Sequence, residues 1–325
     1  LKIPEAKPLN AFESREVKQM IYDFIIIGAG PAGLSAALYA GRAGLSTLVL
    51  ESLGAGGQMN NTDEIANYPG FLDDPSGSAL SEKMRAHAAQ YGAEFRTERV
   101  KSIEQIDGRI KFVHTRRATY EARAILFATG AAPKKLGAEG EEHFSGIGVA
   151  YCATCDGAFF RGQTTAVVGG GNTAFEDALF LARFCPRVYL IHRSNRFRAS
   201  AVLVSQVRKN PKIEILEFTA VKKILGDTTV RQLELEDTRT GAHQSLDCSG
   251  IFIAVGRTPA GEIVPPEVER DESGFLKTNE KMQTNLPGVF AAGDLRTTPL
   301  RQVITAAADG AVAASYAQQY LEENK

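Results

Sequence analysis

Hydrophobic positions along the chain form short apolar runs that alternate with glycine-rich turns and helical patterns. The first run, Tyr22 to Ile27, is rich in β-branched residues and predicts a buried strand. It leads directly into the turn Gly28 to Gly33, a helical pattern from Leu34 to Ala43, and a second predicted strand from Ser46 to Leu50. This order of strand, glycine turn, helix and strand is typical of a dinucleotide-binding unit.

The same order returns about halfway along the chain. Thr165 to Val168 predicts a strand, Gly169 to Ala174 a turn, and Phe175 to Phe184 a helix, before another strand from Val188 to Ile191. Further buried strands are predicted at Ala124 to Gly130, Gly250 to Gly256 and Gly288 to Asp294. We therefore predict an α/β fold of two Rossmann-like, three-layer nucleotide-binding domains.

The segments between these units are shorter and less regular. Ser81 to Tyr91 has a helical period, while Glu94 to Tyr120 and Ile213 to Leu235 predict short strands. A hairpin turn is predicted near Thr240-Gly241. The polar loop Gly54 to Gly70 fits either a cover over a cofactor or an ordinary surface loop.

Charge and composition narrow the range of partners. In 325 residues, 37 Lys and Arg nearly balance 38 Asp and Glu, whereas a nucleic-acid or anionic-membrane surface requires an excess of basic charge. No apolar run reaches the roughly 18–20 residues that cross a bilayer. Residues 1–20 lack the apolar centre of a secretory signal and predict an N-terminal extension. Small molecules or another soluble protein are the expected partners.

Two of the four cysteines, Cys152 and Cys155, are separated by two residues. Such a pair can close a small disulfide ring that opens on taking up two electrons. Half of a zinc site is the alternative, but Cys185 and Cys248 stand alone, so we predict no metal and interpret both as buried small hydrophobic residues. The four do not form a secreted disulfide framework, which predicts a reducing cytoplasm.

The first glycine turn has the features of a site for a dinucleotide with a free ribose hydroxyl. Gly28 permits the tight turn, Gly30 lets a pyrophosphate approach the backbone, and Gly33 lets the helix pack on the strand. The second strand ends at Glu51, whose carboxylate can accept a hydrogen bond from a ribose hydroxyl. A glycine turn without a ligand is the alternative, and the combination of strand, helix and acid argues against it.

Residues near the C-terminus extend this first site. Asp294, after an apolar run, can accept hydrogen bonds from the ribityl chain of a flavin, and the helix opened by Arg301-Gln302-Val303 can face the flavin ring with its N-terminus. The residues expected to bind FAD are Gly28, Gly30, Pro31, Ala32, Gly33, Glu51, Gly57, Gln58, Asn67, Ala128, Gly130, Gly293, Asp294, Arg301, Gln302 and Val303.

The second glycine turn is followed by a basic segment, His192 to Arg198, at the place where the first unit ends in Glu51. Arginines suit a 2′-phosphate, so this site is predicted to take NADPH rather than NADH. A solvated basic loop is the alternative. The residues expected to bind NADPH are Gly169, Gly171, Asn172, Thr173, Ala174, His192, Arg193 and Arg198. Two unlike turns with a cysteine pair between them in sequence indicate FAD at the first and NADPH at the second.

Taken together, these features resemble the low-molecular-weight, bacterial-type thioredoxin reductases, which are FAD-dependent pyridine nucleotide-disulfide oxidoreductases. The resemblance covers Tyr22 to Leu321, and the stretch Cys152-Ala153-Thr154-Cys155-Asp156-Gly157 is especially diagnostic. The other segments that carry it are Gly28 to Gly33, Gly56-Gly57-Gln58, Asn67 to Gly70, Gly169 to Ala174, His192-Arg193 with Arg198, and Gly288 to Asp294.

The resemblance implies a domain arrangement and an electron relay. An NADPH-binding domain, residues 134–257, is expected to be inserted into a discontinuous FAD-binding domain, residues 21–133 and 258–325, after the extension 1–20. Electrons would pass from NADPH to FAD, to the Cys152–Cys155 disulfide and to thioredoxin, with one domain rotating against the other between half-reactions. By resemblance, Cys155 is the flavin-proximal thiol, Cys152 attacks thioredoxin, Asp156 handles protons, and the protein is a cytoplasmic homodimer.

The chain departs from the family pattern at two places. The usual His-Arg-Arg is His192-Arg193-Ser194, with Arg196 as a partial replacement for the missing arginine. The aromatic pair that helps to dock thioredoxin is Ala158-Phe159, which alters docking unless Phe160 contributes.

Two alternative functions stay open at this point. One is a disulfide reductase of the same fold with another donor, such as ferredoxin, or another acceptor. Relatives that use ferredoxin have lost the nicotinamide turn and the basic cluster, whereas this chain keeps Gly169 to Ala174 and two matching arginines. The other alternative is a flavoprotein scaffold switched by nucleotide, and the complete cysteine pair argues against it.

Overall fold

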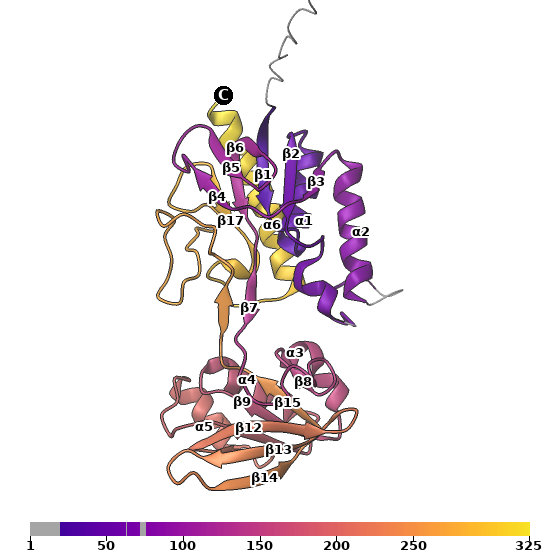
Figure 1. Ribbon diagram of the computed structural model, residues 1–325, viewed down its shortest axis with the longest axis vertical. Helices are drawn as coiled ribbons and strands as arrows, with labels where there is room; N and C mark the ends of the chain where they lie inside the picture. Colours follow the sequence, from indigo (N-terminus) through magenta and orange to yellow (C-terminus); the bar gives the residue numbers. More distant parts are fainter. Residues whose placement is uncertain (1–19, 63, 72–75) are drawn as a thin grey trace, which may run out of the picture.

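The computed structural model describes residues 20–62, 64–71 and 76–325, and the expected N-terminal extension lies outside them except for Met20. The described residues form two bodies, one above the other in Figure 1, which are joined by two chain crossings. The upper body contains the N-terminal and C-terminal parts of the chain, and the lower body contains the middle part. The predicted insertion of one nucleotide-binding domain into another is therefore confirmed.

The upper body, which we call the first domain, is built on a seven-stranded sheet of order β3-β2-β1-β6-β5-β4, with β17 pairing to β6. Its strands are β1 (Ile21–Ile27), β2 (Thr47–Glu51), β3 (Glu94–Thr97), β4 (Ser102–Glu104), β5 (Lys111–His114), β6 (Thr119–Phe127) and β17 (Val289–Ala291). Strands β3, β2, β1, β6 and β17 pair in parallel, whereas β4 and β5 are antiparallel additions. The first domain is thus made from two distant stretches of sequence.

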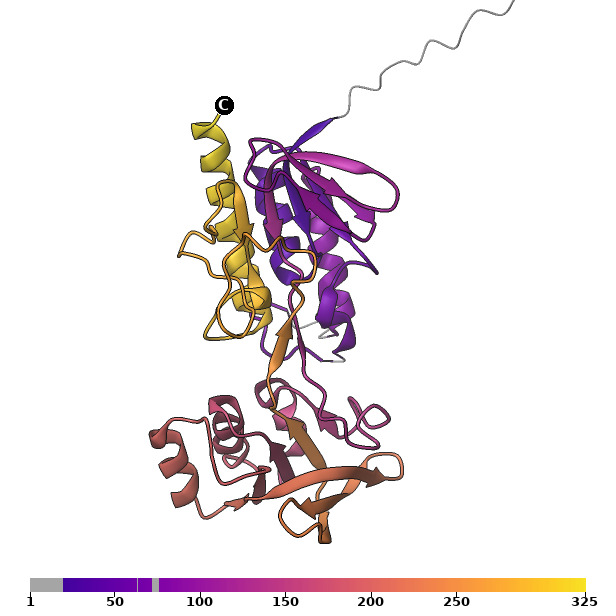
Figure 2. The same cartoon turned by 60° about the vertical axis from the view of Figure 1, so that its left-hand side comes forward.

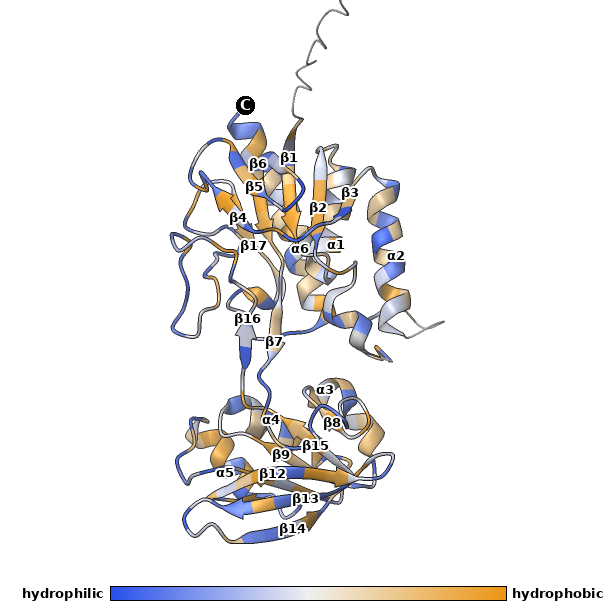
Figure 3. Cartoon of the chain, in the orientation of Figure 1, coloured by the Kyte–Doolittle hydropathy of each residue, from blue (hydrophilic) through white to orange (hydrophobic). Residues whose placement is uncertain are grey.

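Helices cover one face of this sheet. They are α1 (Pro31–Arg42), α2 (Gly77–Gln90) and α6 (Val303–Glu323), with the short turns η1 (Gly57–Asn61) and η3 (Gly293–Leu295) beside them. Strand β1 is buried on both faces: Phe24 and Ile26 belong to the core under the helices, and Ile25 and Ile27 to the core on the other side. This burial explains its continuous apolar run, and Figure 3 shows the apolar residues gathered on the central strands.

The lower body, which we call the second domain, repeats the design with a parallel sheet of order β11-β10-β9-β15-β8. Its strands are β8 (Val149–Ala150), β9 (Thr164–Val168), β10 (Arg187–Ile191), β11 (Ile213–Leu216) and β15 (Gly250–Ile253). An antiparallel sheet covers one face, made of β12 (Thr219–Gly226), β13 (Val230–Asp237) and β14 (His243–Asp247). The helical segments are α3 (Ala153–Asp156), η2 (Gly157–Phe160), α4 (Asn172–Leu181) and α5 (Ala201–Lys209). The predicted three-layer α/β fold is confirmed in both domains.

The two chain crossings between the domains form a short antiparallel ladder. Strand β7 (Ala131–Pro133) pairs with β16 (Arg257–Pro259), and the Lys134 amide donates a hydrogen bond to the Gly256 carbonyl at 2.9 Å. Figure 2 shows this ladder as a narrow neck. Within the residues that the structure describes, no helix combines the length and the apolar character that a membrane span requires.

Several elements begin or end at other residues than the pattern predicts. Helices α1 and α4 begin inside the glycine turns, at Pro31 and Asn172, because the turn backbone already adopts helical dihedral angles there. The strands predicted to end at Gly130 and Gly256 end earlier because the chain turns at these glycines, with φ of +75° and +112°. Helix α5 was not predicted, since its only buried residue is Val207.

Candidate active site

One cavity of about 1710 Å³ lies between the two domains and contains most of the predicted site residues. On the side of the first domain it is lined by Gly30, Pro31, Ala32, Glu51, Gly57, Gln58, Asn67, Ala128, Gly130, Gly293, Asp294, Arg301, Gln302 and Val303. Cys152, Cys155 and Asp156 line it on the side of the second domain. The fold therefore brings the redox cysteine pair to the first glycine turn.

Gly28 and Gly33 do not line this cavity but make its wall possible. A Cβ added to Gly28, where φ is +105°, would lie 2.5 Å from the Ala128 carbonyl oxygen, and one added to Gly33 would lie 1.9 Å from the Gly28 oxygen. A Cβ added to Gly30 would meet no protein atom within 4 Å. Gly28 and Gly33 thus let strand and helix approach each other, whereas Gly30 leaves open space that a ligand can fill.

The Glu51 carboxylate connects the end of β2 to the glycine turn. One of its oxygens accepts a hydrogen bond from the Ala29 amide at 2.9 Å, and the other accepts from the Ser52 amide at 2.6 Å. Gln58, on η1, donates its side-chain amide to the Ala131 carbonyl oxygen at the start of β7. These bonds hold the cavity wall together along the β2 and β7 edges.

The other wall comes from the C-terminal part of the chain. Asp294 follows β17 on η3, and burial raises the pKa of its carboxyl group. The guanidinium of Arg257, on β16, lies 3.7 Å from the Asp294 carboxylate. Farther along, Asp309 on α6 is buried and accepts hydrogen bonds from the Gly293 amide at 3.0 Å and from Arg296. These contacts fix the turn that carries Asp294.

The surroundings of Arg301 indicate that the cavity suits a large polar cofactor. Its guanidinium stacks over the Phe275 ring at 4.3 Å, and its Nε is buried without a hydrogen-bond partner among the described residues. A buried donor without a partner is costly in a protein interior, and a bound group with acceptor atoms would satisfy it. The cavity therefore fits FAD in shape and polarity: it has open space at Gly30, carboxylates at Glu51 and Asp294, and the unpartnered donor of Arg301.

The redox centre sits at the start of α3. Cys152 and Cys155 form a disulfide with a Cα–Cα distance of 5.3 Å, and both residues are half-buried. The Cys152 carbonyl oxygen accepts hydrogen bonds from the Cys155 and Asp156 amides at 3.2 and 3.1 Å. Burial raises the pKa of the Asp156 carboxyl to about 6, so this group changes protonation state close to neutral pH.

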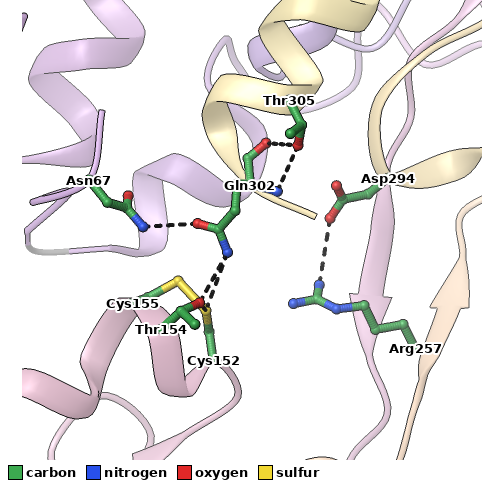
Figure 4. The surroundings of a disulfide bond; sticks show 8 residues. All are labelled: Asn67, Cys152, Thr154, Cys155, Arg257, Asp294, Gln302 and Thr305. Atoms are coloured by element: carbon green, nitrogen blue, oxygen red, sulfur yellow. Dashed lines mark hydrogen bonds and ion pairs between the residues drawn. A yellow bond between two sulfur atoms is a disulfide. The ribbon is translucent and has the colours of Figure 1, made fainter. Parts of the chain in front are cut away.

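Gln302 links the disulfide to the first domain (Figure 4). Its Nε2 donates to Thr154 Oγ1 at 3.3 Å and points to Cys152 Sγ at 3.8 Å, while its Oε1 accepts from Asn67 Nδ2 at 2.9 Å. At the helix start, the Gln302 amide donates to Thr305 Oγ1 at 3.1 Å. The side chain of Gln302 therefore faces the disulfide.

The second glycine turn does not line the cavity. It is covered by the basic segment, because the Gly170 carbonyl oxygen accepts from the Arg198 amide at 2.7 Å and a Cβ on Gly170 would lie 2.3 Å from the His192 ring. Gly169 packs closely on Ala254, whereas a Cβ on Gly171 would meet nothing within 4 Å. The remaining predicted residues of this turn lie at the start of α4, namely Asn172, Thr173 and Ala174.

The arginines beside this second turn are free of acidic partners. Arg193, Arg196 and Arg198 are exposed, and in the described part of the chain their guanidinium groups make no ion pair or hydrogen bond. Burial lowers the pKa of the His192 ring, and both Arg193 and Arg198 add to this effect through their charge. A neutral His192 beside three unpaired cations makes a surface that suits an anionic group.

Sequence reasoning missed several residues that build the site. Arg257, Thr305 and Asp309 contribute contacts that no linear motif marks, although Asp309 is a lone acid in an alanine-rich helical pattern. Thr154 lies inside the cysteine motif but was given no role of its own. In the second domain, the buried Glu141 carboxylate accepts hydrogen bonds from the amides of Leu136 and Gly137 and from the hydroxyl of Tyr151, the residue that precedes Cys152 in sequence. As predicted, Cys185 and Cys248 are buried and free.

Two dinucleotide-binding folds with a disulfide facing one of them define a disulfide oxidoreductase that works with pyridine nucleotides. Residues 22–310 match the model of the family described as pyridine nucleotide-disulphide oxidoreductase, and the chain belongs to this family. Within it, the chain is a member of the thioredoxin reductases. The thioredoxin reductase of Listeria innocua is 46% identical over 310 residues, which are 95% of this chain and 96% of the relative.

Solved structures agree with this assignment. Thioredoxin reductase from Streptococcus pyogenes is 42% identical and has a TM-score of 0.86, with 93% of this chain and 99% of that chain covered. The enzyme from Lactococcus lactis, described as being in its FR conformation, is 41% identical at the same coverage but has a TM-score of only 0.65. The predicted family resemblance is confirmed.

Proposed function

We propose that this oxidoreductase reduces the disulfide of thioredoxin or of a thioredoxin-like protein with electrons from NADPH. The observation that carries the proposal is the shared cavity in which the Cys152–Cys155 disulfide faces the first glycine turn. A curated relative from Mycobacterium leprae supports the acceptor, since it is a bifunctional thioredoxin reductase/thioredoxin, 44% identical over 94% of this chain.

The first turn and its surroundings would hold FAD, which when bound supplies the two-electron chemistry between a nicotinamide and a disulfide. Gly30 leaves room for the pyrophosphate, and Pro31 and Ala32 begin the helix whose N-terminus faces it. Glu51 is placed to accept a hydrogen bond from a ribose hydroxyl, although one of its oxygens already accepts a hydrogen bond from the Ala29 amide. Asp294 would accept from the ribityl chain, and the buried Arg301 Nε would donate to the cofactor.

The cysteines and Asp156 would carry the electrons onward. On taking two electrons the sulfur–sulfur bond would break, with Cys155 as the sulfur that, by family resemblance, receives the electrons and Cys152 as the one that leaves as a thiolate. Cys152 would then attack the acceptor disulfide. Asp156, with a pKa of about 6, would deliver and remove the protons that these steps require.

The second turn would bind NADPH through Gly171, Asn172 and the arginines. Arg193 and Arg198 match the family pattern, and Arg196 is exposed and unpaired beside them, so it can stand in for the arginine that Ser194 replaces. Because this turn lies outside the cavity, nicotinamide and disulfide cannot meet the same cofactor in this arrangement. We infer that the domains rotate about the β7–β16 ladder between the two half-reactions.

The unequal superposition of two relatives supports such a rotation. The chains from Streptococcus pyogenes and Lactococcus lactis are nearly equally similar in sequence, yet their TM-scores are 0.86 and 0.65. Two rigid domains in different relative orientations produce this kind of difference. We propose 21–133 with 258–325 and 134–257 as the moving units, while the homodimer and the cytoplasmic location stay predictions from the family resemblance.

Anaerobic stopped-flow titration of the purified holoenzyme tests the donor. NADPH should first bleach the flavin absorbance as the flavin is reduced, and the absorbance should then return as the electrons pass to the disulfide. Flavin that stays oxidised at millimolar NADPH, but is reduced by ferredoxin, would establish the alternative donor. A scaffold role would be supported by two results together. The reduced holoenzyme would fail to reduce any thioredoxin, and Cys152→Ser would change none of the measured reactions.

A further inference from the structure

Gln302 makes the polar connection between the two domains at the redox centre. Among the described residues, its hydrogen bonds to Thr154 and Cys152 are the only side-chain hydrogen bonds that join residues 134–257 to the rest of the chain, and the ion pair of Arg257 with Asp294 is a separate contact at the neck. The atom that faces Cys152 Sγ is the amide nitrogen, a donor, at 3.8 Å. A sulfur in a disulfide is a weak acceptor, whereas a thiolate is a strong one because it carries a full charge.

Asn67 determines which end of the Gln302 amide faces the sulfur. Its Nδ2 donates to Gln302 Oε1 at 2.9 Å, so the oxygen of the amide is turned toward the first domain and the nitrogen toward the disulfide. The backbone of Gln302 is held as well, since its amide donates to Thr305 Oγ1 at 3.1 Å. The donor is therefore oriented before any charge appears on Cys152.

We propose that Gln302 is a catalytic hydrogen-bond donor that stabilises the Cys152 thiolate as the disulfide is reduced, and that Asn67 positions it. The assignment of Cys152 as the leaving sulfur rests on the proposed function. Two electrons enter at Cys155, the sulfur–sulfur bond breaks, and its electron pair moves to Cys152 Sγ. The charge that develops there meets the Gln302 N–H, and the proton that finally neutralises a thiolate comes from Asp156 or solvent.

The location of this donor on the other domain has a further consequence. Rotation of the second domain separates Cys152 from Gln302, so the stabilisation is present during reduction and absent when Cys152 attacks its acceptor. A thiolate becomes a better nucleophile as the pKa of its thiol rises. Gln302 thus favours formation of the thiolate in one orientation without weakening it as a nucleophile in the other.

The test measures the ionisation of Cys152 without NADPH or thioredoxin. Holoenzyme with Cys155→Ser keeps Cys152 as a free thiol, and its alkylation by iodoacetamide is followed from pH 5 to 10, with the modified site identified by tandem mass spectrometry. Adding Gln302→Leu should move the alkylation midpoint up by about one pH unit and slow alkylation about tenfold below it, because a hydrogen bond to a charged group is lost. Gln319→Leu, the same change at an exposed position of α6, should leave the profile unchanged.

Gln302→Glu separates stabilisation of charge from simple contact between the domains. A carboxylate of the same reach can accept a hydrogen bond from the Thr154 hydroxyl but repels a thiolate, so the midpoint should rise above that of Gln302→Leu. Asn67→Asp should act in the same direction, since an acceptor at this position turns the Gln302 oxygen toward the sulfur. A profile restored by Glu, or a Gln302→Leu profile that matches the Gln319→Leu control, would overturn the proposal.

A second readout connects the donor to electron transfer. In the intact dithiol enzyme, two-electron reduction with dithionite distributes electrons between flavin and disulfide, and Gln302→Leu should increase the fraction of reduced flavin because its dithiol product is less stable. An unchanged distribution together with an unchanged alkylation profile would exclude the role. Neither measurement depends on which donor or acceptor the enzyme uses, so failure of the proposed function would be seen only in the stopped-flow and turnover experiments.

Discussion

Asp309, within α6, accepts hydrogen bonds from both Nε and a terminal nitrogen of Arg296, at 2.7 and 2.8 Å. The same carboxylate accepts from the Gly293 amide at 3.0 Å. Arg296 directly follows the turn η3 that carries Asp294, and both side chains are largely buried, with exposed fractions of 12% for Asp309 and 15% for Arg296. This paired contact holds the wall of the cavity to the final helix.

We expect Asp309→Ala to destabilise the first domain and to weaken retention of FAD. The change leaves the largely buried Arg296 charge without its acidic partner and the Gly293 amide without its acceptor, which costs about 3 kcal/mol for a buried pair of this kind. Thermal unfolding and release of flavin fluorescence measure the two effects. Arg296→Met with Asp309→Leu, which removes both charges, should recover most of the stability, and equal losses in the single and double variants would contradict this explanation.

The two open glycines provide a matched pair of substitutions. A Cβ added at Gly30 or Gly171 would meet no protein atom within 4 Å, and both glycines have an ordinary negative φ. Gly30→Ala and Gly171→Ala should therefore keep the thermal stability of the apoprotein. The added methyl groups occupy ligand space instead. Gly30→Ala should therefore lose FAD, whereas Gly171→Ala should retain FAD but show a KM for NADPH raised about tenfold or more.

Each of these variants is the control for the other, and Gly28→Ala is a control for folding. Its Cβ would lie 2.5 Å from the Ala128 oxygen at a φ of +105°, so it should lower stability even without a ligand. A Gly30→Ala protein that binds FAD normally would show that the pyrophosphate does not approach this turn.

Asp156 should give the reaction a pH dependence near neutrality. Burial raises the pKa of its carboxyl to about 6, so it is protonated below that pH and ionised above it. The rate of thioredoxin reduction should therefore show an inflection near pH 6 that disappears in Asp156→Asn, together with a loss of turnover on the order of 100-fold. Measurement of turnover from pH 5 to 8 distinguishes this from a purely structural effect, which would lower the rate without removing the inflection.

Arg196 and Ser194 should control the preference for NADPH over NADH. We expect Arg196→Ala to raise the KM for NADPH about tenfold with little effect on NADH, because only NADPH carries the 2′-phosphate. Ser194→Arg should lower the KM for NADPH in the same comparison. Arg117→Ala, an exposed arginine of the first domain, is the charge-matched control, and equal effects on both nucleotides would exclude a 2′-phosphate contact.

Local sequence was sufficient for the parts of the site that depend on consecutive residues. The two glycine turns, the cysteine pair and the apolar strands were predicted because backbone approach, ring closure and burial each require particular residues within a short stretch. The inserted arrangement followed from resemblance and is confirmed by the sheets. Element boundaries were less accurate at Pro31, Asn172 and Gly130, where the turn backbone rather than the side-chain pattern decides where an element starts or ends.

Contacts between distant residues could not be read from the chain. Asp309 meets Arg296 and Gly293 because α6 packs against the turn after β17. Gln302 meets Asn67 and the disulfide because the C-terminal part of the chain, which follows the second domain in sequence, packs back on the first domain. Gln302 is expected from the sequence to contact the flavin and lines the cavity with the other expected residues, but its contact with Cys152 could not be predicted.

The motifs of the chain thus predict its chemistry, because they indicate a redox disulfide and two nucleotide-binding turns. Which turn the disulfide faces is a matter of the orientation of two domains about a ladder of two short strands. In this orientation a few polar side-chain contacts cross the interface, between residues far apart in sequence, so no short-range pattern of residues encodes it. The sequence therefore determines the chemistry of the two glycine turns and of the cysteine pair, and the tertiary structure determines that the first turn and the cysteine pair share one cavity.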